Sequence, residues 1–234
     1  MISKIRGAAS TVLIRLGFQR LKKNIQSLPL HLSAIEVEGF LFSKKAELIT
    51  PWQFREELSQ LLKLFSERKP KFILEIGTAN GGTLFAHCRL APDDAVIISI
   101  DLPSGKFGGG YPAWKLPVYK SFAKPKQNLF LLRADSHSAV TFEEVKKILN
   151  GNKLDYLFID GDHTYEGVKQ DFEMYRTFAK ENAVYIFHDI VSHPGSSCKV
   201  YRFWNEVKVG RNHKEFIKDK HQKVFGIGAL LPAN

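Results

Sequence analysis

Two short stretches of the 234-residue chain combine aspartate with histidine in a pattern that suits metal binding and proton transfer. They are the segment 160–163, which reads Asp-Gly-Asp-His, and the pair His188 and Asp189. Each follows directly on a run of apolar residues. Carboxylate oxygens suit Mg²⁺ or Mn²⁺, and the softer imidazole of His188 keeps Zn²⁺ open as a less favoured ion. We therefore predict that Asp160 and Asp189 hold one divalent metal ion, with His188 beside them as a candidate third ligand.

Histidine titrates near neutral pH, as a general base must, so His163 is our preferred base, with Asp160 beside it in the catalytic group. The rivals for this role are His137, His188 and His193. A structural interpretation remains open as well. Under it His163 is inert, Asp189 orients the start of a helix, and Asp162 caps the turn before a helix over residues 165–179.

A glycine-rich turn follows the strand-like segment at residues 72–82, which read "FILEIGTANGG". Such a turn lets the backbone approach a ligand closely. The spacing G-x-x-x-G-G differs from the G-x-G-x-x-G of dinucleotide-binding folds, and no Gly-Lys-Ser/Thr follows that would complete a phosphate-binding loop. We therefore expect this turn to hold a ligand through groups other than phosphate.

Hydrophobic patterning places these polar residues at the ends of strands. Five apolar runs of strand length alternate with segments of helical periodicity, which is typical of a parallel, doubly wound α/β sheet. The expected strands cover residues 72–76, 95–100, 128–132, 154–159 and 183–187. Capping boxes predict helix starts at residues 50–53 and 141–144, and a further helix is expected around residues 200–207. A further strand pair joined by a tight turn is expected at residues 215–217 and 224–231.

Every expected parallel strand delivers a polar residue at its carboxyl end, the edge at which such sheets bind ligands. In chain order these residues are Glu75 with the glycines, Asp101, Asp135 with Ser136, Asp160, and His188 with Asp189. Asp101 lies one strand–helix–strand step after Glu75, where a carboxylate can accept both hydroxyls of a ribose. Two alternatives stay open: Asp101 caps the next turn, and Asp135 with Ser136 forms an ordinary turn.

From about residue 50 to residue 231 the chain resembles the class I S-adenosylmethionine-dependent methyltransferases. The segments "LEIGTANGG", "IISIDLP" and "LLRADSHS" are similar to the first three motifs of that family. "LDYLFIDGDHTYEGVKQD" and "YIFHDI" resemble the branch that groups small bacterial O-methyltransferases, macrolide-sugar methyltransferases and cephalosporin-hydroxylase-like proteins. The resemblance implies a Rossmann-like fold with a mostly parallel seven-stranded sheet, a C-terminal antiparallel strand pair and helices on both faces.

The same resemblance implies S-adenosyl-L-methionine as the cofactor. Its binding residues would be Glu75, Gly77, Thr78, Gly81, Asp101, Leu102, Asp135, Ser136 and Asp160. Glu75 would meet either the cofactor's ammonium group or only backbone amides, because a carboxylate in a buried strand needs a partner. Asp135 and Ser136 would face the adenine.

The implied reaction is methylation of a hydroxyl group on a small-molecule or sugar acceptor. Methyl transfer from a sulfonium is an in-line displacement, and alcohols are weak nucleophiles near pH 7, so a metal ion that lowers the pKa of the hydroxyl would assist it. Metal-dependent members of the branch place acidic residues where this chain has Asp160 and Asp189, often with a further acid or Asn beside the second. His188 stands in that further place and leaves the third ligand open.

An acceptor-binding lid is expected over residues 103–119, because this connection is long and rich in glycine and aromatic residues. On it, Tyr111 and Trp114 would stack on a sugar ring or another flat acceptor. His163 would contact the same acceptor at its reacting hydroxyl.

The formal net charge of +10 is concentrated near the N-terminus. Residues 1–35 carry six Lys or Arg residues and no acid, with apolar residues at roughly helical spacing. We predict that residues 1–45 form a basic amphipathic extension of a methyltransferase domain that covers residues 46–234. Residues 1–30 would pack on a second subunit, cover the site, or lie on an anionic membrane surface.

Composition narrows the setting and the class of protein. Two cysteines are too few for a disulfide framework, and no apolar stretch approaches the ~20 residues of a membrane span, so we expect a cytoplasmic protein, peripheral to a membrane at most. Nucleic acid is not an expected partner, because motifs for base methylation are absent. Two alternatives to an O-methyltransferase stay open: a cephalosporin-hydroxylase-like or otherwise diverged enzyme on the same fold, and a non-catalytic module that binds a cofactor or RNA.

Overall fold

The computed structural model describes residues 2–104 and 109–233, and for residues 2–12 it describes the backbone alone. Its centre is a seven-stranded sheet in the order β3-β2-β1-β4-β5-β7-β6. The first five strands in that order are parallel, and β7 pairs antiparallel with both β5 and β6. The strand bounds are β1 Phe72–Ile76, β2 Val96–Asp101, β3 Asn128–Arg133, β4 Leu154–Ile159, β5 Ala179–His188, β6 His213–Phe216 and β7 Ile227–Leu230. The predicted doubly wound sheet with a C-terminal antiparallel pair is therefore confirmed.

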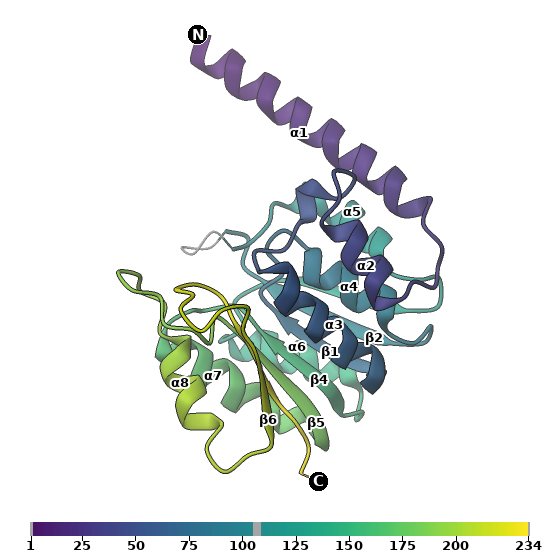
Figure 1. The fold of residues 1–234 in the computed structure, drawn as a ribbon. Coiled ribbons are helices and arrows are strands. Elements are labelled where there is room, and N and C mark those ends of the chain that lie inside the picture. Colours follow the sequence, from purple (N-terminus) through teal and green to yellow (C-terminus); the bar gives the residue numbers. More distant parts are fainter. Residues whose placement is uncertain (1, 105–108, 234) are drawn as a thin grey trace.

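Helices cover both faces of the sheet (Figure 1). One face carries α1 Ile2–Gln26, α2 Ala34–Leu41, α3 Arg55–Arg68, α4 Gly82–Leu90 and α5 Leu116–Tyr119. The other face carries α6 Ala139–Leu149, α7 Tyr165–Tyr175 and α8 Val200–Val207. Short 3₁₀ turns occur at η1 Glu47–Ile49, η2 Ala113–Lys115, η3 Lys120–Phe122 and η4 Arg176–Phe178.

The apolar residues of the central strands divide between two cores, because successive side chains of a strand point to opposite faces. In β1, Ile73 packs under α2, α3 and α4, whereas Leu74 and Ile76 pack under α6 and α7. Burial on both faces explains why the strands read as continuous apolar runs. The chain runs outward from β1 through β2 to β3 and then crosses back to β4 on the other side of β1, so a crevice lies at the carboxyl ends of β1 and β4.

Several predicted boundaries are wrong, and for two helix starts local hydrogen bonds give the reason. Helix α3 begins at Arg55, since the hydroxyl of Thr50 donates to the Leu41 carbonyl and does not cap a helix. Helix α6 begins after Ser138, whose hydroxyl accepts from the backbone N–H of Val140. Helix α7 ends at Tyr175, before the expected residue 179, and β5 begins four residues before the expected 183. Strands β6 and β7 are joined by residues 217–226 and not by a tight turn.

The N-terminal segment has two halves. Helix α1 runs away from the body at its N-terminal end (Figure 1), and Leu13 and Leu16 are exposed there. Its second half buries Phe18, Leu21 and Ile25 in the core cluster that also contains residues of α2 to α4. Residues from the middle of α1 onward therefore pack into the domain, although the boundary at residues 45 and 46 stays a prediction.

The remaining apolar positions expected in the extension, Ile2, Ile5, Ala9 and Val12, lie outside the residues whose side chains are described. Among the described helices, none is both long and apolar enough to cross a bilayer.

Candidate functional site

A cavity of about 610 Å³ lies at the carboxyl ends of the parallel strands. Its walls come from the loops that follow β1, β2, β3, β4 and β5, together with segments before α3 and before β7. The structure brings most of the residues predicted for the site to this one cavity. They are Gly77, Thr78, Gly81, Asp101, Leu102, Asp135, Ser136, Asp160, His163, His188 and Asp189.

The turn after β1 requires glycine at two positions. Gly77 has a φ of 93°, and an added Cβ would lie 2.0 Å from the carbonyl oxygen of Asp160. Gly81 has a φ of 86° and immediately precedes α4, against the ring of Tyr119. Both backbones adopt the left-handed region that L side chains disfavour. The turn thus packs directly on the end of β4, where the second group of candidate residues begins.

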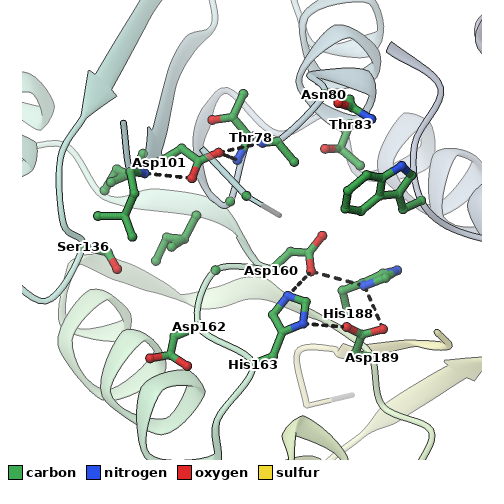
Figure 2. Close-up of a pocket in the computed structure, with 18 of the residues that line it drawn as sticks. Thr78, Asn80, Thr83, Asp101, Ser136, Asp160, Asp162, His163, His188 and Asp189 are labelled. Atoms are coloured by element: carbon green, nitrogen blue, oxygen red, sulfur yellow. Dashed lines mark hydrogen bonds and ion pairs between the residues drawn. The ribbon is translucent and has the colours of Figure 1, made fainter. Parts of the chain in front are cut away.

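Asp101 braces this turn (Figure 2). Its Oδ2 accepts hydrogen bonds from the backbone N–H groups of Thr78 and Ala79 at 3.0 and 2.7 Å, and its Oδ1 accepts from Leu102 N at 2.8 Å. Burial raises the pKa of the Asp101 carboxyl even though backbone N–H groups oppose the shift. Capping of the turn, the structural alternative for Asp101, is therefore present. Oδ2 already accepts two of these three bonds and Oδ1 accepts one, so a ribose hydroxyl would meet Oδ1, and this contact stays a prediction.

Glu75 lies behind the turn and not in the cavity. It is fully buried, and its Oε2 accepts from the hydroxyl of Ser99 at 2.7 Å. The Ser99 hydroxyl lies 2.6 Å from that of Thr78, which does line the cavity. Burial raises the pKa of Glu75 to about 8. The expectation that Glu75 meets the cofactor directly is wrong in this arrangement, because Ser99 and Thr78 stand between the carboxyl and the cavity.

The acidic and histidine residues of the predicted metal site converge at the other end of the cavity (Figure 2). Ligand atoms of Asp160, His188 and Asp189 all lie within 4.8 Å of one another. His188 Nδ1 is 3.2 Å from Asp160 Oδ1 and 3.3 Å from Asp189 Oδ1. The two carboxylates come from the ends of the neighbouring strands β4 and β5. Asp189 has a φ of 62°, which is uncommon for a residue other than glycine.

His163 bridges the same two carboxylates. Its Nε2 lies 3.4 Å from Asp160 Oδ1, and its Nδ1 lies 3.1 Å from Asp189 Oδ2. A second group of three possible ligands, His163, Asp189 and Cys198, shares Asp189 with the first. His193 approaches from the following loop, with Nε2 3.3 Å from Asp189 Oδ1 and accepting from Phe225 N at 2.9 Å.

The pKa values in this group follow from burial and from the opposite charges. Burial opposes ionisation of Asp160 and Asp189, yet the neighbouring His188 holds the pKa of both carboxyls below the usual range. Burial also opposes the imidazolium form of His188 and His163. The facing carboxylates outweigh it and raise both pKa values, that of His163 to about 10. Without another cation, both imidazoles would therefore carry a proton at neutral pH.

Two predicted acceptor residues are placed elsewhere. Tyr111 is 1% exposed and packs against Tyr119 and Arg133 in the core. Trp114 packs edge-on against Phe18 of α1, with ring centroids 5.1 Å apart. Neither residue lines the cavity, so their expected stacking on the acceptor is wrong.

The predicted lid over residues 103–119 is described only in part. Ser104 and Gly109 line the cavity, and residues 105–108 lie outside the described part of the chain.

Sequence reasoning missed a wall formed by the residues before α3 and before β7. Trp52 lines the cavity with 58% of its surface exposed. Beside it, Gln53 is 7% exposed, and its Oε1 has no hydrogen-bond partner among the described residues. Val224 and Phe225 line the cavity from the loop between β6 and β7. An exposed tryptophan gives no periodic signal, and the loop reaches the site only because β7 pairs with β5.

Glu57 fixes that loop to α3. Its Oε1 accepts from Lys218 N at 3.2 Å and from Gln222 Nε2 at 2.7 Å, and its Oε2 accepts from Gly226 N at 3.1 Å. The side chain is fully buried, and one carboxylate thus satisfies three donors of the loop. Asn80, Thr83 and His137 also line the cavity and were not predicted as binding residues.

Comparison with solved structures places the fold among O-methyltransferases. The O-methyltransferase TomG from Streptomyces achromogenes, involved in tomaymycin synthesis and solved with S-adenosylmethionine, is 16% identical, with a TM-score of 0.56 over 87% of this chain and 91% of that one. An O-methyltransferase from Bacillus cereus, solved with S-adenosylhomocysteine, is 15% identical, with a TM-score of 0.52 over 85% and 90%. At these identities the likeness concerns the fold.

Sequence comparison gives the family. An uncharacterised protein of Sinorhizobium fredii is 27% identical over 152 residues, which are 63% of this chain and 16% of that protein, so the match spans about a sixth of the relative's length. Residues 74–190, half of the chain, match a family model described as a methyltransferase domain. That segment runs from β1 and its glycine turn to the pair His188 and Asp189, and so contains most of the cavity wall. Because this match covers half of the chain, the chain belongs to the methyltransferase-domain family.

Proposed function

We propose that the protein is an S-adenosylmethionine-dependent O-methyltransferase that uses a divalent metal ion and acts on a hydroxyl of a small-molecule or sugar acceptor. One observation carries this proposal. A single cavity is lined by the glycine turn with its Asp101 brace and by the group of Asp160, His188 and Asp189. A cofactor and a hydroxyl-activating ion would thus share one space.

The cofactor would lie along the loops that follow β1, β2 and β3. Gly77, Gly81 and the backbone around Thr78 offer close approach, Asp101 and Leu102 would meet the ribose, and Asp135 with Ser136 would meet the adenine. Figure 2 labels Thr78, Asp101 and Ser136 around one side of the pocket. When bound, S-adenosylmethionine supplies an electrophilic methyl group. TomG and the Bacillus cereus protein, which share the fold, were solved with this cofactor and with its demethylated product.

The side chains at the other end of the cavity fit a divalent ion. Both ring nitrogens of His188 and Oδ1 of Asp189 are buried and lack a hydrogen-bond partner of good geometry within the described residues. Buried polar atoms are costly when left unpaired, and a metal ion held between the two carboxylates would satisfy Asp189 Oδ1 and the Nδ1 of His188, the ring nitrogen that faces them. Two carboxylates and one imidazole suit Mn²⁺, with Mg²⁺ and Zn²⁺ as alternatives. A bound ion would supply the charge that lowers the pKa of an acceptor hydroxyl.

His163 would take the proton of that hydroxyl. With two carboxylates beside it and its pKa raised to about 10, the imidazole is protonated at neutral pH and cannot accept a proton. A cation shared by Asp160 and Asp189 would reduce the negative charge that faces His163 and so lower its pKa. The metal and base assignments therefore depend on each other.

The acceptor would lie against the wall of Trp52, Gln53, Val224 and Phe225. Trp52 offers an exposed indole face for a ring, and the unpartnered Gln53 Oε1 would accept a hydrogen bond from a hydroxyl group. In this proposal these residues replace Tyr111 and Trp114, which the fold keeps away from the cavity.

Calorimetry with S-adenosylhomocysteine, together with electron paramagnetic resonance of Mn²⁺, tests the two halves of the site separately. Asp101→Asn weakens the hydrogen bonds that brace the turn, each worth about 1.5 to 3 kcal/mol, so it should reduce cofactor affinity more than tenfold and leave Mn²⁺ binding intact. Asp189→Asn should weaken Mn²⁺ binding and leave the affinity for S-adenosylhomocysteine intact. Asp94→Asn, on an exposed surface carboxylate, is the matched control and should change neither. Binding of NAD without any binding of S-adenosylhomocysteine would overturn the proposal. Unchanged Mn²⁺ binding in Asp189→Asn would contradict the metal-binding part of the proposal.

A further inference from the structure

Helix α1 presents two different faces in its described half. Phe18, Leu21 and Ile25 lie at a spacing of three and four residues and are buried against the domain. Leu13, Leu16, Arg20 and Lys23 repeat at the same spacing and are all exposed. With 3.6 residues per turn, these two sets lie on roughly opposite sides of the helix. We call the second set the outward face; no described residue covers it.

The outward face belongs to the most basic part of the chain. Residues 1–35 contain six Lys or Arg residues, and the first acidic residue is Glu36, so this segment holds six of the ten net positive charges. The sequence N-terminal to Leu13 continues the apolar spacing at residues 2, 5, 9 and 12. The helix backbone runs clear of the body in this region (Figure 1). Charge and exposed leucines therefore coincide where the helix leaves the domain.

We propose that the outward face of α1 docks on an anionic membrane surface. A helix that combines a strip of leucines with Lys and Arg and no acid suits the interface of such a membrane. Leu13 and Leu16 would enter the boundary between headgroups and acyl chains, while Arg20 and Lys23 extend to lipid phosphates. The buried face of Phe18, Leu21 and Ile25 would hold the domain to the helix.

Other occupants fit the outward face less well. In a twofold dimer the same patch meets itself, so the basic residues of two copies would approach one another without any acid to pair with them. A nucleic acid would neutralise Arg20 and Lys23 but leave Leu13 and Leu16 in water. An anionic membrane satisfies both the charge and the apolar side chains.

The docked helix would also contact residues 114–119, a segment that is hydrogen-bonded to the cavity wall. Phe18 contacts Trp114, and the guanidinium of Arg15 lies over the same indole at 5.8 Å. A few residues later, the hydroxyl of Tyr119 donates to the Ala79 carbonyl of the glycine turn at 3.0 Å. The helix is thus joined through one short segment to the turn after β1. The docking itself does not rest on the proposed methyl transfer.

Co-sedimentation of the full chain with vesicles tests the proposal. The probe is a phosphatidylcholine vesicle with or without about 30% phosphatidylglycerol, a content at which basic residues contribute measurably to binding. We expect the chain to bind the vesicles that contain phosphatidylglycerol and not those of phosphatidylcholine only. Added salt should weaken this binding. Leu13→Ser with Leu16→Ser, and separately Arg20→Glu with Lys23→Glu, should each reduce the partition coefficient at least tenfold.

Matched controls carry the same changes on other exposed parts of the surface. Val140→Ser with Val209→Ser removes apolar side chains that are 80% and 74% exposed, and Lys146→Glu with Lys147→Glu reverses two exposed charges on α6. Both controls should bind vesicles as the unaltered chain does. Circular dichroism melting of every variant confirms that the fold is kept, as expected for exposed positions.

Three results would overturn the proposal. One is the absence of binding to anionic vesicles, and another is equal loss in the control variants. The third is a dimer in analytical ultracentrifugation that Leu13→Ser with Leu16→Ser dissociates while vesicle binding is unchanged, since the outward face would then be an interface between two copies.

Discussion

The contact between the glycine turn and the end of β4 can be tested with Gly77→Ala. At a φ of 93°, an alanine costs about 1 to 2 kcal/mol from its backbone conformation alone. Its Cβ would also lie 2.0 Å from the Asp160 carbonyl oxygen and 2.5 Å from the carbonyl carbon, where ordinary contacts begin near 3.4 Å. Because the obstacle is backbone, no side-chain rotation can relieve it.

Relief requires β1 and β4 to separate at this point. The hydrogen bonds from Asp160 N to Ile76 O at 2.8 Å and from Gly77 N to Ile100 O at 2.9 Å are the ones at risk. At about 1 kcal/mol for each, together with the conformational cost, Gly77→Ala should lose about 3 to 4 kcal/mol of unfolding free energy. The displaced Asp160 should also weaken Mn²⁺ binding, and the altered turn should weaken binding of S-adenosylhomocysteine.

The matched control is Gly210→Ala. Gly210 has a φ of 70°, and nothing lies within 4 Å of the position that an added Cβ would take, so the substitution carries only the conformational cost of about 1 to 2 kcal/mol. Urea unfolding followed by circular dichroism gives both values, and calorimetry gives the ligand affinities. If Gly77→Ala loses no more stability than Gly210→Ala and keeps its cofactor affinity, the close packing of the turn on β4 does not govern the site.

Three further expectations concern buried groups. Burial raises the folded-state pKa of Glu75 from 4.5 to about 8, so the unaltered chain should lose unfolding free energy, by several kcal/mol at most, as pH rises from 4.5 to 8. Glu75→Gln should lack this pH dependence. Parallel stability–pH profiles for the two proteins would refute the expectation. Glu57→Ala removes three hydrogen bonds and should cost about 2 to 3 kcal/mol and speed proteolysis of the loop between β6 and β7, whereas the exposed Glu56→Ala should cost less than about 0.5 kcal/mol. Phe18→Ala should cost about 3 kcal/mol or more in urea unfolding, and Leu16→Ala almost nothing, if the second half of α1 belongs to the core.

Patterns that depend on burial were readable from the sequence. The strands of the parallel sheet are apolar on both faces, so their runs stand out, and the polar residues that end them fall at one edge by topology alone. This is why Asp160, His188 and Asp189 were expected to meet, and they do. Helix starts were less predictable. Thr50 donates its hydroxyl to the Leu41 carbonyl instead of capping a helix, and Ser138 caps α6 three residues before the expected capping box. A short sequence motif does not encode these contacts.

The directions of individual side chains and the contacts between distant segments could not be predicted from the sequence. Tyr111 and Trp114 carry aromatic rings on a glycine-rich segment, which suits a lid as well as it suits a core. The position of Trp114 depends on α1, which packs against that segment from far earlier in the chain. Trp52 gave no signal because its surroundings come from a loop far along the sequence.

The attachment of the loop between β6 and β7 to Glu57 makes one wall of the cavity separable from the rest of the site. The loop carries Val224 and Phe225 into the cavity, yet it touches neither the glycine turn nor the interior of the parallel sheet through its anchoring bonds. Insertions or replacements within it can therefore reshape one wall while the carboxylate on α3 keeps both ends in place. Grafting other loops between β6 and β7 while Glu57 is retained is a practical way to change the shape of this wall.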